Sequence, residues 1–210
     1  MCLAQVNTPK RTPQCTPQRG HSLIELLATL SIAVILLGIG APSLVDFITS
    51  SMATRYANDL IADINFARGE AITRGTTVVI CKGPTATNCT TGQWENGWKV
   101  FVDCNDNRLV TPAGNASRCP GNAAEEVLRV HSALANGWTL RGNSKVANRI
   151  TFQPDGRTTN NGTLVACKGG VLNTGNQTSS SAVVVNVTGR ARVAQDGNGD
   201  GIPDGVAGCN

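Results

Sequence analysis

Hydrophobic residues are most continuous near the start of the chain, where an apolar stretch begins at Leu23 and runs to Val45. From Leu23 to Gly40 the only charged side chain is that of Glu25. These eighteen residues would span about 27 Å as an α-helix at ~1.5 Å per residue, close to the ~30 Å hydrocarbon core of a bilayer. The pattern predicts a membrane-spanning helix over residues 21–45.

A helical pattern continues beyond this stretch. Pro42 should kink or loosen the helix, because it cannot donate a backbone hydrogen bond. Apolar residues then recur at spacings of four, four, three and four, which is the periodicity of one helix face. They are Tyr56, Leu60, Ile64, Ala67 and Ala71. We predict an amphipathic helix over residues 46–75, capped by Gly75, whose stripe packs on a sheet; a docking face for a partner helix is the alternative.

Short runs of β-branched and apolar residues fill the rest of the chain, separated by loops rich in Gly, Asn and Thr. We predict strands over residues 77–81, 97–103, 127–131, 138–140, 149–152, 163–167, 182–187 and 190–193. The strongest of them, residues 97–103, has apolar side chains on alternate sides. A long helix followed by an antiparallel sheet is an α+β fold, with residues 76–210 as one β-rich domain.

The segment before the apolar stretch, residues 1–20, is short, basic and proline-containing, and it ends at Gly20. An ordinary secretory signal places its hydrophobic run before the cleavage site, so that the run is removed. Here the plausible cleavage site precedes the run. We therefore expect the apolar helix to remain in the mature protein.

These residues resemble the type IV pilin class, in which a prepilin peptidase cuts after the glycine and methylates the new N-terminus. The matching positions are Gly20, His21 as the new terminus, Glu25 and Pro42; the class usually has Phe where this chain has His21. The resemblance implies a single-pass protein of the bacterial inner membrane with a periplasmic domain, which assembles with other major and minor pilins into a type IV pilus. A generic membrane anchor is the alternative, but it does not explain the lone acid.

Glu25 has a physical role of its own in this picture. A carboxylate in hydrocarbon costs several kcal/mol unless it is paired or protonated. The nearest expected partner is the amino terminus of an adjacent copy, freed at His21. Such a pairing would set the register of subunits in an assembling filament.

Six of the eight cysteines lie beyond the apolar helix, and an even number there indicates disulfides in an oxidising compartment such as the periplasm. They are Cys81, Cys89, Cys104, Cys119, Cys167 and Cys209, whereas Cys2 and Cys15 lie in the leader. Six cysteines allow fifteen connectivities. We favour Cys81–Cys89 and Cys104–Cys119, which close short loops, with Cys167–Cys209 tying the tail to a strand. Zinc is the alternative, but there is no C-x-x-C pair and the only histidine beyond the helix is His131.

Further matches narrow the resemblance to the minor pilins of the FimT/FimU and GspH type, and most of all to FimT. They lie in residues 66–81, 96–103, 128–131 and 152–157, in the expected order. The resemblance implies a low-abundance filament component rather than an enzyme. No G-x-S-x-G, P-loop or H-E-x-x-H motif is present, and His131, which lies in an apolar strand pattern, is interpreted as structural.

The sharpest local feature is the sequence Gly189-Arg190-Ala191-Arg192, which follows an apolar run. Gly189 permits a tight turn, and in an extended chain Arg190 and Arg192 point to one side, where two guanidinium groups match neighbouring phosphates. This G-R-x-R sequence resembles the C-terminal motif with which FimT-type pilins bind DNA during natural transformation. A solvated turn at a strand end is the alternative. Lys145 lies outside the motif and is expected to contribute little.

Overall charge adds no support for DNA binding. The formal net charge is +4, but the leader carries Lys10, Arg11 and Arg19 and no acid, so the mature chain is only +1 (15 basic minus 14 acidic residues). Any basic site must therefore be local. Aromatic residues make up only 4% of the chain, which argues against base stacking, so DNA binding would be led by phosphates. Lys168 and Arg157 are candidates to extend the arginine patch.

The tail, residues 196–204, alternates acids and an amide in a D-x-N-x-D-G-x-x-D pattern that resembles calcium loops. The candidate ligands are Asp196, Asn198, Asp200 and Asp204. The usual bidentate Glu is replaced by Ala207, so a Ca²⁺ site would be weak or completed elsewhere. The alternative is a Gly/Asp loop closed by Cys209. A second acidic stretch, residues 103–107, is interpreted as a turn after a strand.

Three functions remain open from the sequence. The chain could be a minor pilin that binds DNA, so that a retracting pilus carries DNA toward the cell. It could be a purely structural minor pilin that primes pilus assembly. It could also be a pseudopilin of a type II secretion system that contacts exported proteins. The arginine pair favours the first.

Overall fold

The computed structural model describes residues 22–85, 88–111, 119, 123–169, 180–195 and 209. The chain divides into two units, residues 1–42 and 43–210, and the helix α1 (Leu23–Arg74) contributes to both. In the first unit, α1 exposes large apolar side chains such as Leu30 and Leu37. Among the helical residues that the structure describes, none forms a segment with both the length and the hydropathy of a membrane span.

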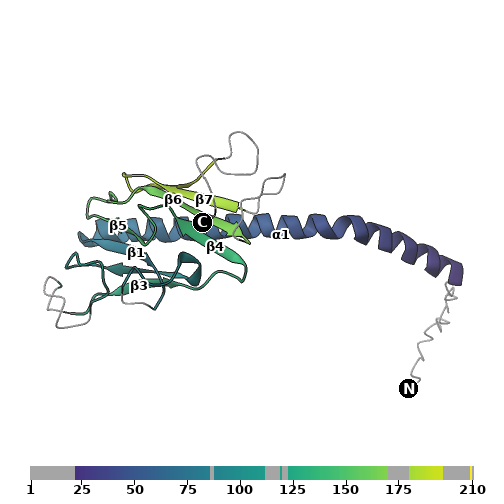
Figure 1. Cartoon of the computed structure of the whole chain (residues 1–210), viewed down its shortest axis with the longest axis horizontal. Coiled ribbons are helices and arrows are strands. Elements are labelled where there is room, and N and C mark those ends of the chain that lie inside the picture. The colour runs from purple at the N-terminus through teal and green to yellow at the C-terminus, as the bar shows by residue number, and fades with distance from the viewer. Residues whose placement is uncertain are drawn as a thin grey trace, which may run out of the picture. The chain divides into compact units, whose positions relative to one another are not determined.

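The second unit contains two four-stranded antiparallel sheets (Figure 1). The first has the order β3-β2-β1-β5, with β1 (Val78–Lys82), β2 (Trp98–Val102), β3 (Val127–His131) and β5 (Arg149–Phe152). The second has the order β4-β6-β7-β8, with β4 (Trp138–Gly142), β6 (Gly162–Lys168), β7 (Ser180–Val185) and β8 (Ala191–Val193). A short 3-10 helix, η1 (Trp94–Asn96), precedes β2. The α+β prediction is confirmed, and the strands divide between two sheets because β5 returns to pair with β1 and β4 pairs with β6.

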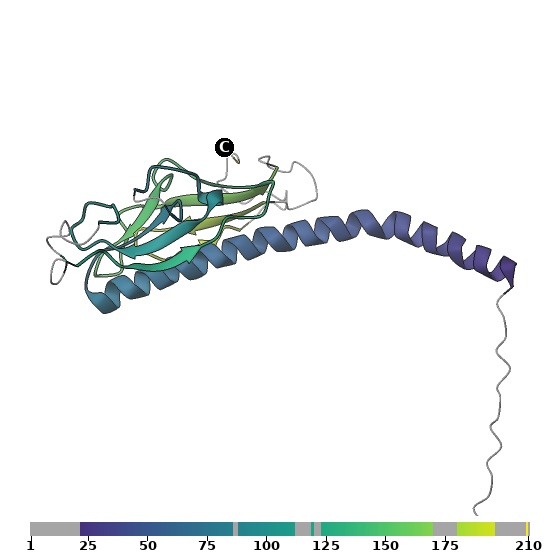
Figure 2. The ribbon, with the colours of Figure 1, turned by 90° about the horizontal axis from the view of Figure 1, so that it is seen from below.

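The C-terminal half of α1 lies along the sheets and supplies one wall of the core (Figure 2). All five residues of the predicted stripe are at most 8% exposed, from Tyr56 to Ala71. They pack against inward-facing residues of both sheets, including Ile80, Trp98 and Leu164. The helix ends at Arg74, and Gly75 follows with φ 61°, as expected of a glycine C-cap.

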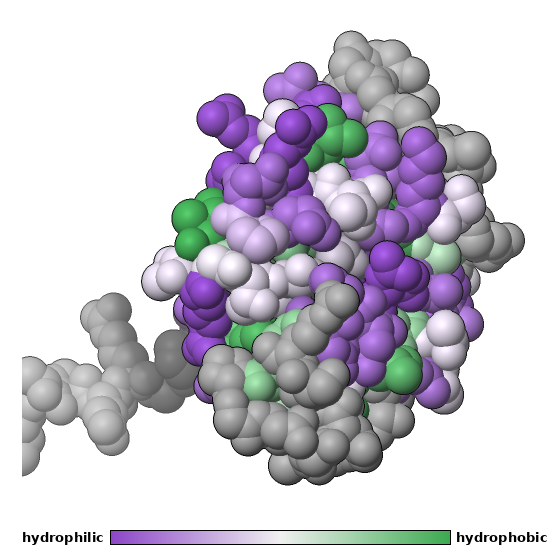
Figure 3. All heavy atoms as spheres, turned by 90° about the vertical axis from the view of Figure 1, so that its left-hand side faces the viewer, coloured by the Kyte–Doolittle hydropathy of each residue, from purple (hydrophilic) through white to green (hydrophobic). Residues whose placement is uncertain are grey.

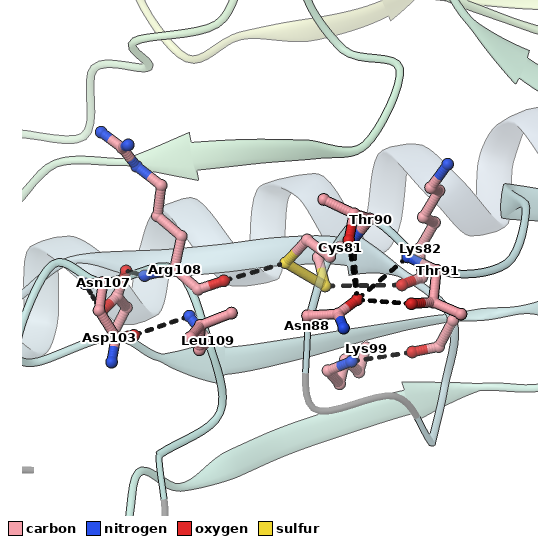
Figure 4. Close-up of a disulfide and its surroundings, with 12 residues drawn as sticks. Cys81, Lys82, Asn88, Thr90, Thr91, Lys99, Asp103, Asn107, Arg108 and Leu109 are labelled. Atoms are coloured by element: carbon pink, nitrogen blue, oxygen red, sulfur yellow. Dashed lines mark hydrogen bonds between the residues drawn. A yellow bond between two sulfur atoms is a disulfide. The ribbon is translucent and has the colours of Figure 1, made fainter. Parts of the chain in front are cut away.

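The outer face of the first sheet is covered over β1 and β2 rather than solvated. Every residue of β2 is buried, including Lys99, which is only 2% exposed. The Lys99 ammonium donates a 2.9 Å hydrogen bond to the carbonyl of Gly83, in the loop that the Cys81–Cys89 disulfide closes (Figure 4). Both faces of β2 are therefore buried, because the loop that the Cys81–Cys89 disulfide closes covers the side of Lys99.

Three disulfides join the predicted pairs. The Cα–Cα distances are 5.2 Å for Cys81–Cys89, 5.3 Å for Cys104–Cys119 and 6.0 Å for Cys167–Cys209, within the usual range. The first crosslink is buried on the outer face of the first sheet, with Val79 and Phe101. The last lies on the outer face of the second sheet, with Val165 and Ala182.

Candidate nucleic-acid interface

The hairpin that joins β7 to β8 presents the arginine motif. Strand β7 ends at Val185, two residues earlier than predicted, because Asn186–Gly189 form a tight turn. The Asn186 carbonyl accepts the Gly189 N–H at 2.9 Å, and the Asn186 side-chain oxygen accepts the Arg190 N–H at 3.0 Å. Gly189 has φ 75°, in the left-handed region that glycine adopts most readily. The predicted tight turn is confirmed.

Arg190 and Arg192 lie on one side of this hairpin. Between them Ala191 packs against the core, opposite Val185, whereas Arg192 pairs with Val184. Because cross-strand partners share a face, both arginines point away from the core, and both are exposed. Within the described ranges, neither guanidinium group has an ion-pair partner. The hairpin therefore presents two exposed guanidinium groups on one side.

A second loop, residues 153–158, lies against this turn and carries Arg157. The Thr158 N–H donates to the Val187 carbonyl at 3.2 Å. Arg157 is exposed in this loop, and its membership of the arginine patch stays a prediction. Its backbone N–H donates to Asp155 Oδ1 at 2.9 Å, which places one carboxylate in the same loop.

Arg68 of α1 also reaches this turn, and the sequence did not point to it. Its Nε donates a 2.9 Å hydrogen bond to the carbonyl of Gly156. A Cβ built at Gly189 would lie 3.1 Å from both Cδ and Nε of Arg68. The side chain is half-buried, which suits a positioning role more than direct contact with a ligand. Its place beside the buried stripe residue Ala67 is the one signal that could have indicated it.

The end of the domain at the left of Figure 1, where α1 terminates, has a largely hydrophilic surface with small separate hydrophobic patches (Figure 3). The β7–β8 turn belongs to this end because Gly189 contacts Arg68, near the C-terminus of α1. A polar surface with exposed guanidinium groups favours a charged ligand over an apolar one.

Lys168 does not extend the arginine patch. It is the last residue of β6, where it pairs with Trp138 of β4. Arg192 of β8 pairs with Val184 of β7, which in turn pairs with Thr163 near the start of β6. Lys168 is five positions beyond Thr163 along the extended strand, about 17 Å at ~3.3 Å per residue. The Lys168 ammonium instead donates to the Asn136 carbonyl at 3.3 Å and lies 5.7 Å from the centre of the Trp138 ring. The predicted proximity was wrong, because the antiparallel strand carries the lysine to the opposite end of the sheet.

Residues 56–189 match the family model described as type II transport protein GspH. The chain belongs to the GspH family. Residues 15–41 match the prokaryotic N-terminal methylation motif. Two crystal structures of the type IV minor pilin FimU from Pseudomonas aeruginosa are similar to this GspH-family chain, at 19% identity; they cover 71% and 68% of it and 92% of FimU, with TM-scores of 0.48 and 0.45. Among curated proteins, no significant match was found.

The two matched regions together cover most of the chain. The methylation motif includes Gly20 and Glu25, and the family match extends from Tyr56 to Gly189. This GspH-family protein is therefore a GspH-like minor pilin or pseudopilin, a structural class of protein. Arg190 and Arg192 lie just beyond the family match, so their role depends on their own geometry.

Asp63 of α1 is the centre of a buried polar cluster in the GspH-family domain. Its carboxylate accepts hydrogen bonds from Trp98 Nε1 at 2.8 Å and from Arg129 Nη1 at 2.7 Å, and lies 3.3 Å from His131 Nδ1. His131 also stacks on Trp98, with ring centroids 3.9 Å apart. Burial alone would raise the pKa of Asp63, but the hydrogen bonds from His131, Arg129 and Trp98 outweigh it and hold the pKa below its usual value. These contacts support the structural interpretation of His131.

The acidic loop after β2 forms the predicted turn. Asp103 accepts hydrogen bonds from the N–H groups of Asn107 at 3.1 Å and Arg108 at 2.9 Å (Figure 4). Burial raises the pKa of Asp103 to about 6, and the nearby Glu125 carboxylate adds to the effect. Glu125 itself accepts the Cys104 N–H at 3.0 Å, beside the Cys104–Cys119 disulfide. Because those sulfurs are bonded to each other, this group of potential ligands is not a zinc site.

The structure does not test the roles predicted for several site residues. Gly20 and His21 lie outside the described residues, as do the four proposed calcium ligands, Asp196, Asn198, Asp200 and Asp204. Processing and calcium binding stay predictions. Glu25 is exposed in the first turn of α1, where its N–H donates to the Ser22 carbonyl at 3.0 Å. The helix continues through Pro42, and the kink predicted there stays a prediction because Pro42 borders the two units.

Proposed function

We propose that this GspH-family protein is a minor pilin of a type IV pilus that binds duplex DNA without sequence preference, for DNA uptake in natural transformation. The observation that carries the proposal is the placement of Arg190 and Arg192 on one exposed face of the β7–β8 hairpin. Four backbone and side-chain hydrogen bonds fix the backbone of the turn from which the arginines project, which lowers the entropic cost of binding. Guanidinium groups bind phosphate oxygens in a forked geometry, which positions a protein on DNA without reading bases.

The pilin part of the proposal is supported by the N-terminal region. The methylation motif over residues 15–41 agrees with cleavage after Gly20 by a prepilin peptidase. The apolar side chains that α1 exposes between Leu23 and Ile48 need cover from lipid or from other pilins. We infer a single-pass anchor over residues 21–45 in the inner membrane, a periplasmic domain stabilised by disulfides, and later incorporation into the pilus. In that arrangement Glu25 would pair with the amino terminus of a neighbouring pilin.

Cleavage and anchoring are tested by the intact mass of the protein recovered from membranes. We expect loss of residues 1–20 and gain of one methyl group on His21. A mature chain that begins beyond Val45 would contradict the anchor.

DNA binding is tested on the full chain in non-ionic detergent, by fluorescence anisotropy with a labelled duplex at several salt concentrations. Replacing both Arg190 and Arg192 by Ala should weaken binding to different duplex sequences about equally. The slope of log affinity against log salt should flatten by ~1.8, at roughly 0.9 for each lost phosphate contact. Lys168→Ala is the matched control, because it removes one exposed cation from the same sheet at its other end. If the double variant keeps the wild-type slope, the arginines form only a solvated turn.

The competing proposal is a purely structural role, either priming pilus assembly or acting in a type II secretion system. The match to a family described as type II transport protein GspH favours it, as does the nearly neutral charge of the mature chain. Under that proposal the double arginine variant would assemble and function as the wild type does. Under the DNA-binding proposal it should still assemble, while transformation falls.

A further inference from the structure

Two hollows lie along the β4–β5 loop, and the second of them reaches the β7–β8 turn. The first, of about 440 Å³, lies between the β4–β5 loop and the β5–β6 loop and is lined by Lys145, Arg149 and several amide and hydroxyl side chains. The second, of about 400 Å³, shares Lys145 and Asn161 with the first and continues to Asn186 in the β7–β8 turn. The two hollows therefore lead from the β5 edge to the base of the arginine motif.

Strand register places the second hollow and Arg192 on one face of the second sheet. Thr163 pairs with Val184, and Val184 pairs with Arg192, so the three side chains form one row across β6, β7 and β8. Thr163 and Val184 line the second hollow. Two strand spacings of ~4.8 Å put Arg192 about 10 Å from Thr163.

Lys145 is the cation at the junction of the two hollows. It is exposed, and its ammonium lies 3.4 Å from Asn161 Oδ1. Arg149 lines the far side of the first hollow, where burial lowers its pKa and the nearby Arg108 cation lowers it further. In the described part of the chain, no ion pair joins Lys145 or Arg149 to a carboxylate. The second hollow thus connects Lys145 to the β7–β8 turn, although Lys145 lies outside the motif in sequence.

The loops that form these hollows are fixed by hydrogen bonds and close packing. Asn160 Nδ2 donates to the Lys145 carbonyl at 3.0 Å, and the Asn143 N–H donates to the Thr163 carbonyl at 3.0 Å. A Cβ at Gly162 would overlap the side chain of Asn143, so the two loops meet as closely as glycine allows. The backbone that carries Lys145 is thus held in place before any ligand arrives.

We propose that these hollows form the second half of the DNA surface, with Lys145 contacting a backbone phosphate other than the phosphates held by Arg190 and Arg192. The inference rests on the proposed DNA-binding function and extends its site. Lys145 and Asn186 line the same hollow, and the Asn186 side chain accepts the Arg190 N–H, so the two cationic positions border one surface. Amide and hydroxyl groups such as Asn161 and Thr163 then donate hydrogen bonds to phosphate and sugar oxygens, as is common at protein–DNA interfaces.

The test uses the full chain in detergent and a labelled duplex, with salt titrations of Lys145→Ala, Lys145→Arg, Lys168→Ala and the double arginine variant. Lys145→Ala should weaken binding severalfold at low salt and flatten the salt slope by ~0.9, whereas Lys145→Arg should keep both. Combined with the arginine substitutions, it should flatten the slope by ~2.7 in total. Lys168→Ala should match the wild type.

The outcomes separate the two proposals. If Lys145→Ala keeps the wild-type slope while the double arginine variant loses it, this inference is wrong and the arginine site stands. If neither variant changes the slope, DNA binding through this face is wrong altogether. If Lys145→Arg loses affinity as Lys145→Ala does, the phosphate contact is also wrong. Circular dichroism melting of each variant identifies any that fail to fold, and Lys145→Gln then replaces the alanine variant.

Discussion

Gly189 lies directly against the carbonyl oxygen of Gly156, so close that a Cβ at position 189 would overlap it. This contact locks the turn that presents the two arginines onto the neighbouring 153–158 loop. The same carbonyl accepts the 2.9 Å hydrogen bond from Arg68, so helix and both loops meet at one oxygen atom. The turn of the arginine motif is thus fixed by its contacts with the 153–158 loop and with Arg68 of α1. Gly189 therefore matters for packing as well as for backbone conformation.

Gly189→Ala should therefore cost more than its backbone conformation alone predicts. A left-handed alanine costs ~1–2 kcal/mol, and the overlap should add ~1–3 kcal/mol as the loop shifts. Gly169→Ala is the matched control, because Gly169 has a similar φ of 72° and a Cβ added there would meet no described atom within 4 Å. Urea unfolding of the two variants should give clearly different losses in the free energy of unfolding. Equal losses would show that the contact with Gly156 contributes nothing.

Substitution of Asp63 should weaken the packing of α1 on the first sheet. Asp63→Asn keeps the shape but removes the charge that Arg129 and His131 face, and its amide cannot accept every bond the carboxylate accepts. Arg129 is itself partly exposed, with 43% of its side chain accessible, so solvent screens part of the loss. We expect the free energy of unfolding at pH 7 to fall by about 2–3 kcal/mol.

The comparison for this prediction is Asp59→Asn, on the same helix. Asp59 forms a 3.7 Å surface ion pair with Arg55, whose side chain is 72% exposed. Its loss should change stability by less than ~1 kcal/mol. An equal effect of the two substitutions, measured by chemical denaturation, would rule out a special role for the buried cluster.

Local periodicity explains which parts of the fold and site could be predicted. The stripe of α1 and the shared face of Arg190 and Arg192 depend only on residues close in sequence, and both are confirmed. Arg68 was missed because its role depends on the approach of two loops more than 80 residues away along the chain. Lys168 was misplaced for the converse reason, since strand pairing, not sequence order, decides which end of a sheet a residue occupies.

The burial of individual strand residues could not be predicted from the sequence either, as Lys99 shows. Lys99 alternates with apolar neighbours in β2, a pattern that normally indicates a solvated face. It is buried because a disulfide-closed loop folds over it and supplies the Gly83 carbonyl as an acceptor. Loops of this kind have no hydrophobic periodicity, so their path over a sheet is decided by crosslinks and turns.

Asp103 should make stability depend on mildly acidic pH. Its folded pKa of about 6 exceeds the ordinary value of 3.8, so between about pH 4 and 6 the folded protein binds a proton that the unfolded chain does not. The free energy of unfolding should therefore rise as the pH falls through this window. A shift of about two pKa units corresponds to about 3 kcal/mol, at 1.36 kcal/mol per unit.

The measurement compares wild type with Asp103→Asn by urea unfolding from pH 4 to pH 8. The difference between the two profiles removes the titration of other groups, including the Asp63 cluster. The asparagine variant should lack the rise on acidification. If the two profiles run parallel, Asp103 is ionised in the folded protein throughout this range.

The three disulfides should differ in their contribution to stability in the order of their loop lengths. The chain-entropy model assigns about 2.5, 3 and 4 kcal/mol to the loops of 8, 15 and 42 residues closed by Cys81–Cys89, Cys104–Cys119 and Cys167–Cys209. Replacing each pair by two alanines avoids burying new hydroxyl groups. The pair Cys167→Ala with Cys209→Ala should therefore lower the free energy of unfolding most.

Packing makes a competing prediction for the same variants. Cys81 and Cys89 are 0% and 2% exposed within the cluster around Phe101, so their alanine pair also loses buried sulfur contacts there. If packing dominates, this variant will be the least stable of the three. Reduction and alkylation cannot separate the two effects, because the alkyl group adds bulk to the same cluster. The order of the urea midpoints for the three alanine pairs therefore decides whether chain entropy or packing sets the stability of this domain.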